Sequence, residues 1–254
     1  YGNMIESAYF DTDGEPVRDK EGVMKVEAVY NNKGYISSIS YVDAGGNLVP
    51  NKIGIAQVTI TYDNNNNLEK ISFKDADGAP CPIANVRLEY DESGNQTGQF
   101  VSCLEDKLFQ PAGFNWRAKY DKGNLVEKVY LNNVKEPYLN PNEGYAKYIA
   151  KYNERGRLIE LSFFDTEEKP CLNNKGYAKV SYGYDEWGNV TEILFLGVDG
   201  KPCTDSSGVA RCVMRYDERG NKIEEATFDP EGNPCLNAQG AAKMTAVCDS
   251  WGNV

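Results

Sequence analysis

Four of the seven cysteines recur at equivalent places in the chain, where a regular array of thiols could bind metal ions or form disulfides. Each lies fifteen residues after the start of a repeated segment that is described below. These four are Cys81, Cys171, Cys203 and Cys235. Other copies place apolar residues there, namely Val17, Val49, Phe109 and Tyr138. The position therefore selects for an apolar side chain, and a buried cysteine serves as a small hydrophobe. Because the total is odd and no Cys-x-x-Cys pair occurs, we predict neither a metal site nor a disulfide framework.

Acidic residues cluster in short turns that share the first ligands of a calcium loop. Two of these turns are Asp11-Thr12-Asp13-Gly14 and Asp75-Ala76-Asp77-Gly78. Both lack the further ligands and the bidentate glutamate that complete such a loop, and the copy Gly197-Val198-Asp199-Gly200 drops an acid. An aspartate that opens a turn also accepts hydrogen bonds from nearby backbone N–H groups. Turn formation is the better interpretation, and weak calcium binding is the alternative.

Residues suited to catalysis are scarce. The chain has no histidine, so neither a histidine-dependent triad nor a histidine-ligated metal can form. We find no Gly-x-Ser-x-Gly elbow and no glycine-rich phosphate loop. Paired carboxylates remain open, but the acids recur at turns, where they already have a structural role. We predict that the protein is not an enzyme and needs no cofactor.

Tyrosines recur at one strand position and would form a ladder along a sheet. They are Tyr30, Tyr62, Tyr90, Tyr120, Tyr152, Tyr184 and Tyr216. These residues share the alternation phase of the apolar positions, which favours packing over a sugar-stacking surface.

Five aromatic residues outside that ladder are better candidates for contact with a partner. Trp187 and Trp251 lie at the tips of predicted turns. Phe109, Phe114 and Trp116 lie in residues 82–122, where the repeat becomes irregular. Local departures from a pattern can mark function, although repeats also decay without consequence.

A unit of about 32 residues repeats along the whole chain. Alignment on the glycine of Tyr-Asp-x-x-Gly-Asn gives eight unit starts. These are Gly2, Gly34, Asn66, Gly94, Gly123, Gly156, Gly188 and Gly220. We therefore interpret residues 1–254 as one array of eight units. Both ends of the sequence fall inside a unit, which predicts a fragment of a longer protein.

Each unit contains two segments in which apolar residues alternate with polar ones. An example is the run Ala178, Val180, Tyr182, Tyr184, and a second segment carries Ile193 and Phe195. Alternation with period two indicates strands with one buried face, and Asp-x-x-Gly between them indicates a hairpin. A short segment with a proline then leads through Asn-x-x-Gly to the next unit, and we expect that turn to be a corner. The predicted fold is all-β, with tandem antiparallel hairpins in a continuous twisted or spiral sheet; a β-solenoid is the alternative.

Charge limits the class of partner. The formal net charge is −11, and polyanions such as nucleic acids and anionic membranes would be repelled. No apolar run approaches the roughly 18 residues that a membrane-spanning helix requires. We expect no nucleic acid and no membrane insertion, while protein or neutral glycan ligands remain open.

The motif Tyr216-Asp217-Glu218-Arg219-Gly220-Asn221 resembles the YD repeats of the bacterial RHS family, and the same motif begins at Tyr184. The likeness covers the whole chain, although the period here is longer than is typical of that family. The resemblance implies a bacterial protein, displayed at the cell surface or secreted, whose repeats form a β-sheet shell or stalk. It brings no catalytic residues. We expect a noncatalytic module for binding or adhesion, or alternatively a structural spacer that presents neighbouring domains of its parent chain.

Overall fold

The computed structural model describes residues 2–103 and 115–247, which consist of β-strands and turns without a helix. The chain divides into two compact parts, an N-terminal part of residues 1–115 and a C-terminal part of residues 116–254. The N-terminal strands are β1 (Glu6–Ala8), β2 (Lys25–Tyr30), β3 (Ile36–Val42), β4 (Gln57–Tyr62), β5 (Leu68–Lys74), β6 (Pro80–Tyr90) and β7 (Gln96–Cys103). The next strand, β8 (Asn115–Asp121), begins at the boundary between the parts. The C-terminal strands are β9 (Asn124–Leu131), β10 (Lys147–Tyr152), β11 (Leu158–Phe164), β12 (Lys179–Tyr184), β13 (Val190–Leu196), β14 (Arg211–Tyr216), β15 (Lys222–Phe228) and β16 (Lys243–Thr245).

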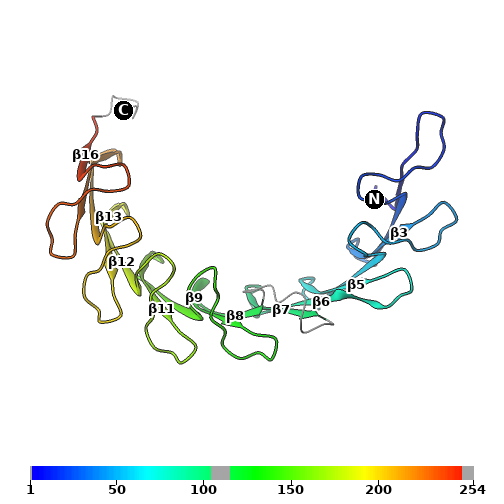
Figure 1. The fold of residues 1–254 in the computed structure, drawn as a ribbon, viewed down its shortest axis with the longest axis horizontal. Coiled ribbons are helices and arrows are strands. Elements are labelled where there is room, and N and C mark those ends of the chain that lie inside the picture. The colour runs from blue at the N-terminus through cyan, green and yellow to red at the C-terminus, as the bar shows by residue number, and fades with distance from the viewer. Residues whose placement is uncertain (1, 104–114, 248–254) are drawn as a thin grey trace. The chain divides into compact units, whose positions relative to one another are not determined.

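Within each part the strands lie side by side in chain order (Figure 1). Every registered pair is antiparallel, as in β12 with β13 and β13 with β14. The prediction of an all-β array of antiparallel hairpins is therefore confirmed, and the β-solenoid alternative is wrong. None of the residues described by the structure forms a helix long and apolar enough to cross a membrane.

The Tyr-Asp-x-x-Gly-Asn turn is a five-residue loop built on its first aspartate. In the β14–β15 hairpin, the Asp217 N–H donates to the Asn221 carbonyl at 3.0 Å, and the Gly220 N–H donates to the Asp217 carbonyl at 3.0 Å. The Asp217 carboxylate accepts the backbone N–H groups of Arg219 and Asn221, each at 2.9 Å. Gly220 has a φ of 84°, the left-handed conformation that glycine adopts without strain. The motif therefore encodes one hairpin geometry.

The register of each such hairpin shifts by one residue just before its tyrosine, for example between Arg215 and Tyr216. A β-bulge of this kind follows from closing a hairpin with a left-handed residue. The repeat that begins at Asn66 keeps the same loop because asparagine tolerates this conformation, here at a φ of 67°.

The connection between hairpins is longer and contains two turns. After β11, a turn from Asp165 leads to Pro170, which forms an isolated bridge with Phe164. A second turn from Asn173 then leads into β12, which pairs with β11. The segment that carries Pro170 is thus too short for a full strand, as the sequence indicated, whereas Pro80 in the repeat that begins at Asn66 is the first residue of β6.

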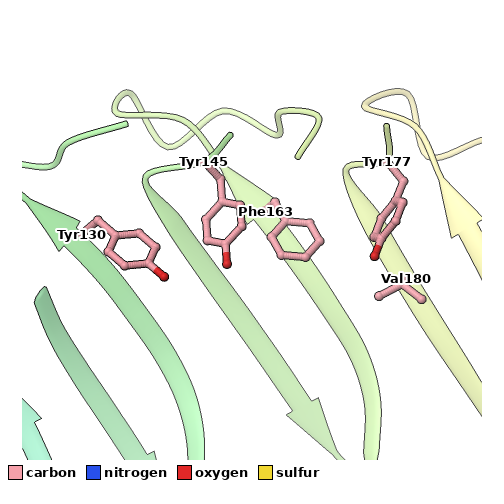
Figure 2. Packing of buried hydrophobic residues seen from close by; sticks show 5 residues of the cluster. All are labelled: Tyr130, Tyr145, Phe163, Tyr177 and Val180. Atoms are coloured by element: carbon pink, nitrogen blue, oxygen red, sulfur yellow. The ribbon is translucent and has the colours of Figure 1, made fainter. Parts of the chain in front are cut away.

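Aromatic rings form a continuous row in the core of the C-terminal part. We call this set the aromatic row, and it comprises Tyr130, Tyr145, Phe163, Tyr177 and Phe195. Successive ring centroids lie 5.8, 4.7, 5.9 and 4.6 Å apart. Figure 2 shows four of these rings beside Val180. Along the row, a ring from a strand alternates with a ring from the segment that leads into the next strand. Tyr145 and Tyr177 precede β10 and β12, so the connecting loops contribute rings to the core between hairpins.

Candidate functional site

The recurrent tyrosines join each hairpin to the preceding one. The Tyr62 hydroxyl donates to the carbonyl of Ile36, the first residue of β3, at 2.9 Å. The Tyr184 hydroxyl donates in the same way to Leu158, the first residue of β11, at 2.7 Å. Equivalent bonds are made by Tyr30, Tyr152 and Tyr216. We call these bonds tyrosine joints, and they extend the predicted packing role of the tyrosines to a specific hydrogen bond.

The recurrent cysteines also join one repeat to the preceding repeat. The Cys171 sulfur lies 3.8 Å from the Gly144 carbonyl oxygen, and the Cys203 sulfur lies 3.8 Å from that of Gly176. Cys81 and Cys235 make the corresponding contacts with Gly54 and Gly208. All four are free thiols; Cys81 is buried, and the other three are partly buried.

The environment of these thiols opposes reactivity. Burial raises the pKa of Cys171 above its usual value, and the neighbouring Asp165 raises it further. Burial, followed by the nearby carboxylates Asp199 and Asp205, does the same to the pKa of Cys203. Since the thiolate is the nucleophile and the metal ligand, these thiols are poorly suited to either role.

One turn departs from the others because two arginines hold its backbone. Arg155 donates through Nη1 to the Glu186 carbonyl at 2.7 Å. Arg157 donates through Nη2 to the Trp187 carbonyl at 3.1 Å, and its guanidinium lies 5.7 Å from the Tyr184 ring centroid. We call this arrangement the arginine clamp. It holds the β12–β13 turn from the turn of the preceding hairpin, between β10 and β11.

The arginine clamp holds the candidate partner residue Trp187 in an exposed position. Its side chain is 73% exposed, although its carbonyl is bonded. A shallow recess of about 350 Å³ lies nearby, lined by the two clamp arginines together with Asn153, Glu154, Tyr184 and Asp185. The arginine bonds hold the backbone of Trp187, while the residue stays exposed. The arrangement can therefore present an aromatic ring beside charged and amide groups.

The clamp arginines were not among the residues singled out from the sequence. The available signal was their spacing, because Arg155 precedes Glu186 by 31 residues and Arg157 precedes Trp187 by 30. That interval is close to one repeat, so residues at this spacing meet in neighbouring turns.

Trp116 occupies a different environment from Trp187. It is half-buried in β8, packs against the aromatic row, and has the Lys128 ammonium 4.6 Å from its ring centroid. A cation over the face of an indole is a favourable contact that can serve structure alone. The other predicted contact residues, Phe109, Phe114 and Trp251, lie outside the described residues.

Within residues 2–103 and 115–247, no group of three or more histidine, cysteine, aspartate or glutamate side chains is placed to hold a metal ion. In the same ranges every buried side-chain nitrogen or oxygen has a hydrogen-bond partner. The carboxylates of the turn aspartates accept hydrogen bonds from backbone N–H groups. The Asp11 carboxylate, for example, accepts from the N–H groups of Asp13 and Glu15 at 2.9 Å each. The acidic turns thus have the structural role that the sequence favoured.

No protein-family model matches the chain, and no curated protein sequence matches it. Among solved structures, the chain is similar to TcdB2-TccC3-TEV, with 12% identity and a TM-score of 0.38 over 88% of this chain. It is also similar to the Tc holotoxin pore of Photorhabdus luminescens, with 13% identity and a TM-score of 0.31 over 89% of this chain. A porin-like protein from Bacteroides uniformis has 13% identity and a TM-score of 0.24, covering 83% of this chain and 69% of its own.

The chain spans only 12% of the length of the first of these structures and 13% of the second. Likeness at this level of identity and TM-score carries no conclusion about what this chain does.

Proposed function

We propose that this chain is a noncatalytic structural repeat module, a spacer or shell that positions neighbouring domains of a longer protein. The tyrosine joint is the observation that carries the proposal. The recurrent tyrosines and cysteines, which are the conspicuous groups in the sequence, bind the preceding repeat. An array whose stability depends on contacts between adjacent repeats can be lengthened or shortened by whole repeats.

The turn motif supports a bacterial origin for such a module. Tyr184 and Tyr216 each begin a Tyr-Asp-x-x-Gly-Asn turn like those of YD-repeat proteins of the RHS type. In that family the repeats form a shell or stalk at the cell surface or in a secreted protein. Assignment to this family is part of the proposal and rests on the motif.

Deletion of one whole repeat tests this modular role. Removal of residues 157–188 takes out 32 residues, one full period of the array. A variant lacking residues 157–172 removes half as many and places a strand where a turn belongs. We expect the whole-repeat deletion to keep β-sheet circular dichroism and amide protection in β2–β5, β14 and β15. We expect the half-repeat deletion to lose protection in β12–β15. Equal damage by both deletions would overturn the modular interpretation.

A binding role is the second candidate, and the arginine clamp favours it. The clamp holds the backbone that carries Trp187, a residue that is 73% exposed, and a contact residue gains from a backbone that is held in place. The clamp groups suit a neutral glycan, because sugar hydroxyls accept from arginines and donate to the carboxylate of Glu154. The net charge of −11 also favours a neutral ligand over an acidic polymer.

Glycan binding can be tested on an array of neutral oligosaccharides with the wild-type chain and Trp187→Ala. We expect binding of at least one oligosaccharide, with a loss of about tenfold or more in the variant, since an anchoring aromatic contributes more than about 1.4 kcal/mol. Tyr35→Ala is the matched control, because Tyr35 is also exposed, at 44%, and closes the corresponding turn from Asn31 in the N-terminal part. If both variants bind the oligosaccharides as the wild type does, Trp187 is not a glycan contact.

A further inference from the structure

A second cavity lies away from the arginine clamp, and its lining includes Phe163 of the aromatic row. Its volume is about 350 Å³, and strands β10, β11 and β12 form its floor. Apolar side chains supply much of the lining, including Ile149, Phe164, Pro170 and Val198. We call it the β10–β12 pocket. Its size falls within the range of small-molecule sites.

Three charged side chains meet at this pocket and leave it with a net positive charge. The Lys151 ammonium lies 2.8 Å from Glu160 Oε1, and the Lys179 ammonium lies 3.4 Å from Glu160 Oε2. Among the residues that line the pocket, two cations and one anion give a charge of +1 in a chain whose net charge is −11, and the Asp199 carboxylate lies in the adjoining turn. Each ammonium has three N–H donors, so the contact with Glu160 leaves donors for another acceptor.

One wall of the pocket departs from the turn pattern that is followed elsewhere. Gly197, Val198 and Gly200 line the pocket, and Gly197 occupies the first position of its turn. Six other turns of this type begin with an acid or amide, namely Asp11, Asp43, Asp75, Asn132, Asp165 and Asp229. The backbone bonds persist without that side chain, since the Gly197 N–H donates to the Lys201 carbonyl at 2.8 Å. The Asp199 carboxylate accepts the Lys201 N–H at 3.0 Å, the bond that Asp165 accepts from Lys169 at 2.9 Å in the equivalent turn, so this turn closes without an acid at position 197.

The missing carboxylate matters for the chemistry of the pocket. An aspartate at position 197 would add a carboxylate to the pocket wall beside that of Asp199, whose Oδ1 lies 3.2 Å from the position of a Cβ at residue 197. The departure at this cavity is Gly197 itself. Lys151 has basic counterparts in Lys119 and Arg215, and Ser162 has counterparts in Ser40 and Ser72.

We propose that the β10–β12 pocket binds a small carboxylate with an apolar body. The apolar part would lie against Ile149, Phe164 and Val198, and the carboxylate would accept from the ammonium groups of Lys151 and Lys179. This binding role goes beyond that of a structural module and does not depend on it. It is also separate from the glycan contact at Trp187, because no residue lines both cavities.

The test is a titration of the uniformly ¹⁵N-labelled full chain with 4-phenylbutyrate, followed through the amide signals of Gly197 and Gly200. The neutral analogue 4-phenyl-1-butanol separates the contribution of the carboxylate. We expect saturable shifts with the acid and binding at least about fivefold weaker with the alcohol, a loss typical of one charge interaction in a partly solvated site.

Substitutions at position 197 provide a matched pair of variants. Gly197→Asp restores the usual turn residue and adds a charge, whereas Gly197→Asn restores the turn without a charge. Both should fold, because the nearest atoms to a Cβ at this position are Asp199 Oδ1 at 3.2 Å, Cys203 Cβ at 3.7 Å and the Lys201 oxygen at 3.8 Å. The turns at Asp11 and Asp75 already combine two aspartates in this way.

The two variants should bind the probe differently while melting at temperatures close to that of the wild type. We expect Gly197→Asp to bind 4-phenylbutyrate about fivefold more weakly and Gly197→Asn to stay within about twofold of the wild type. Lys179→Gln should weaken binding to the same degree as Gly197→Asp, since it also removes the net charge. Failure of the wild type to bind saturably, equal affinity for acid and alcohol, or equal affinity of the two position-197 variants would overturn the proposal.

Discussion

The two compact parts share one hairpin geometry but differ in what fills the space beneath the connecting loops. Tyr145 and Ala146 lie directly before β10, and Tyr177 and Ala178 lie directly before β12. Both tyrosine rings belong to the aromatic row. In the N-terminal part Val23 and Ile55 occupy this place, as Val209 and Ala241 do in the last two loops of the C-terminal part, and all four close the same loop through their carbonyls. The tyrosine joint and the aspartate turn occur in both parts. Turn chemistry thus sets the geometry, and the size of the loop residue sets how much core each repeat contains.

The largest test of this comparison is removal of the loop residue in each part. Tyr177 is 8% exposed and contacts the rings of Phe163 and Phe195, so Tyr177→Ala should cost about 3–4 kcal/mol of local stability. Val23 is also buried, at 4%, but Val23→Ala removes only two methyl groups and should cost about 1.5 kcal/mol. Hydrogen exchange of amides in β11–β13 and in β2–β3 measures both costs in the folded chain. Equal costs would show that the aromatic row adds no stability.

The sequence predicted the shared geometry better than it predicted this difference. The period, the alternation and the Tyr-Asp-x-x-Gly-Asn motif were enough for the hairpins, because each depends on residues close in sequence. The apolar character expected of Cys171 and Tyr184 was also visible. Their specific partners, Gly144 and Leu158, lie 27 and 26 residues away, and alternation alone does not show which atoms meet across repeats.

The candidate sites were predicted less completely for the same reason. Trp187 was recognisable as a residue at a turn tip, but the arginine clamp depends on side chains reaching from one turn to the next. The β10–β12 pocket combines residues from three strands with a turn that begins at Gly197. Gly197 was noticed only as a missing acid, because its position relative to Lys151 and Lys179 depends on the fold.

Glycine substitution at the turn tips distinguishes the clamped turn of the C-terminal part from its unclamped counterpart. Gly34 has a φ of 86°, and the nearest atom to an added Cβ is 3.9 Å away, so Gly34→Ala should cost only the left-handed conformation, about 1–2 kcal/mol. Gly188 has a φ of 104°, and its added Cβ would meet the Arg157 guanidinium at 2.1 Å. Gly188→Ala should therefore cost about 1 kcal/mol more, because the arginine must leave the Trp187 carbonyl.

Thermal unfolding and the indole signal of Trp187 report on these two variants. We expect both to lower the melting temperature and only Gly188→Ala to shift the Trp187 side-chain resonance. If the two glycines behave alike in both measurements, the arginine clamp does not stabilise the turn.

The tyrosine joint should contribute equally in the two parts, since its geometry is the same in each. Tyr62→Phe and Tyr184→Phe each remove one hydroxyl donor, bonded at 2.9 Å and 2.7 Å respectively, and each should cost about 1 kcal/mol. The phenylalanine ring keeps the packing, and in the second case it also keeps the stacking with Arg157. Local opening measured by hydrogen exchange at Ile36 and Leu158 checks the prediction. A cost confined to one part would mean that the joint depends on the surrounding core.

The smallest expected effect is the pH dependence of the shared turn, which Asp91 represents in the N-terminal part and Asp217 in the C-terminal part. Hydrogen bonds from the side-chain amides of Asn95 and Asn221, followed by those from backbone N–H groups, hold the pKa of each carboxyl below its usual value. A carboxyl whose pKa is lower in the folded state stabilises the fold above its unfolded-state pKa, near 3.9, and loses that contribution as pH falls through the folded pKa. Hairpin protection should therefore fall only in acid, and by the same amount in both parts. Carboxyl ¹³C titration of the wild type, Asn95→Ala and Asn221→Ala measures the cause directly, because each variant should move its aspartate pKa back toward the usual value. Unchanged aspartate pKa values in both variants would assign the shift to the backbone N–H groups and remove the asparagine of the motif from the turn mechanism.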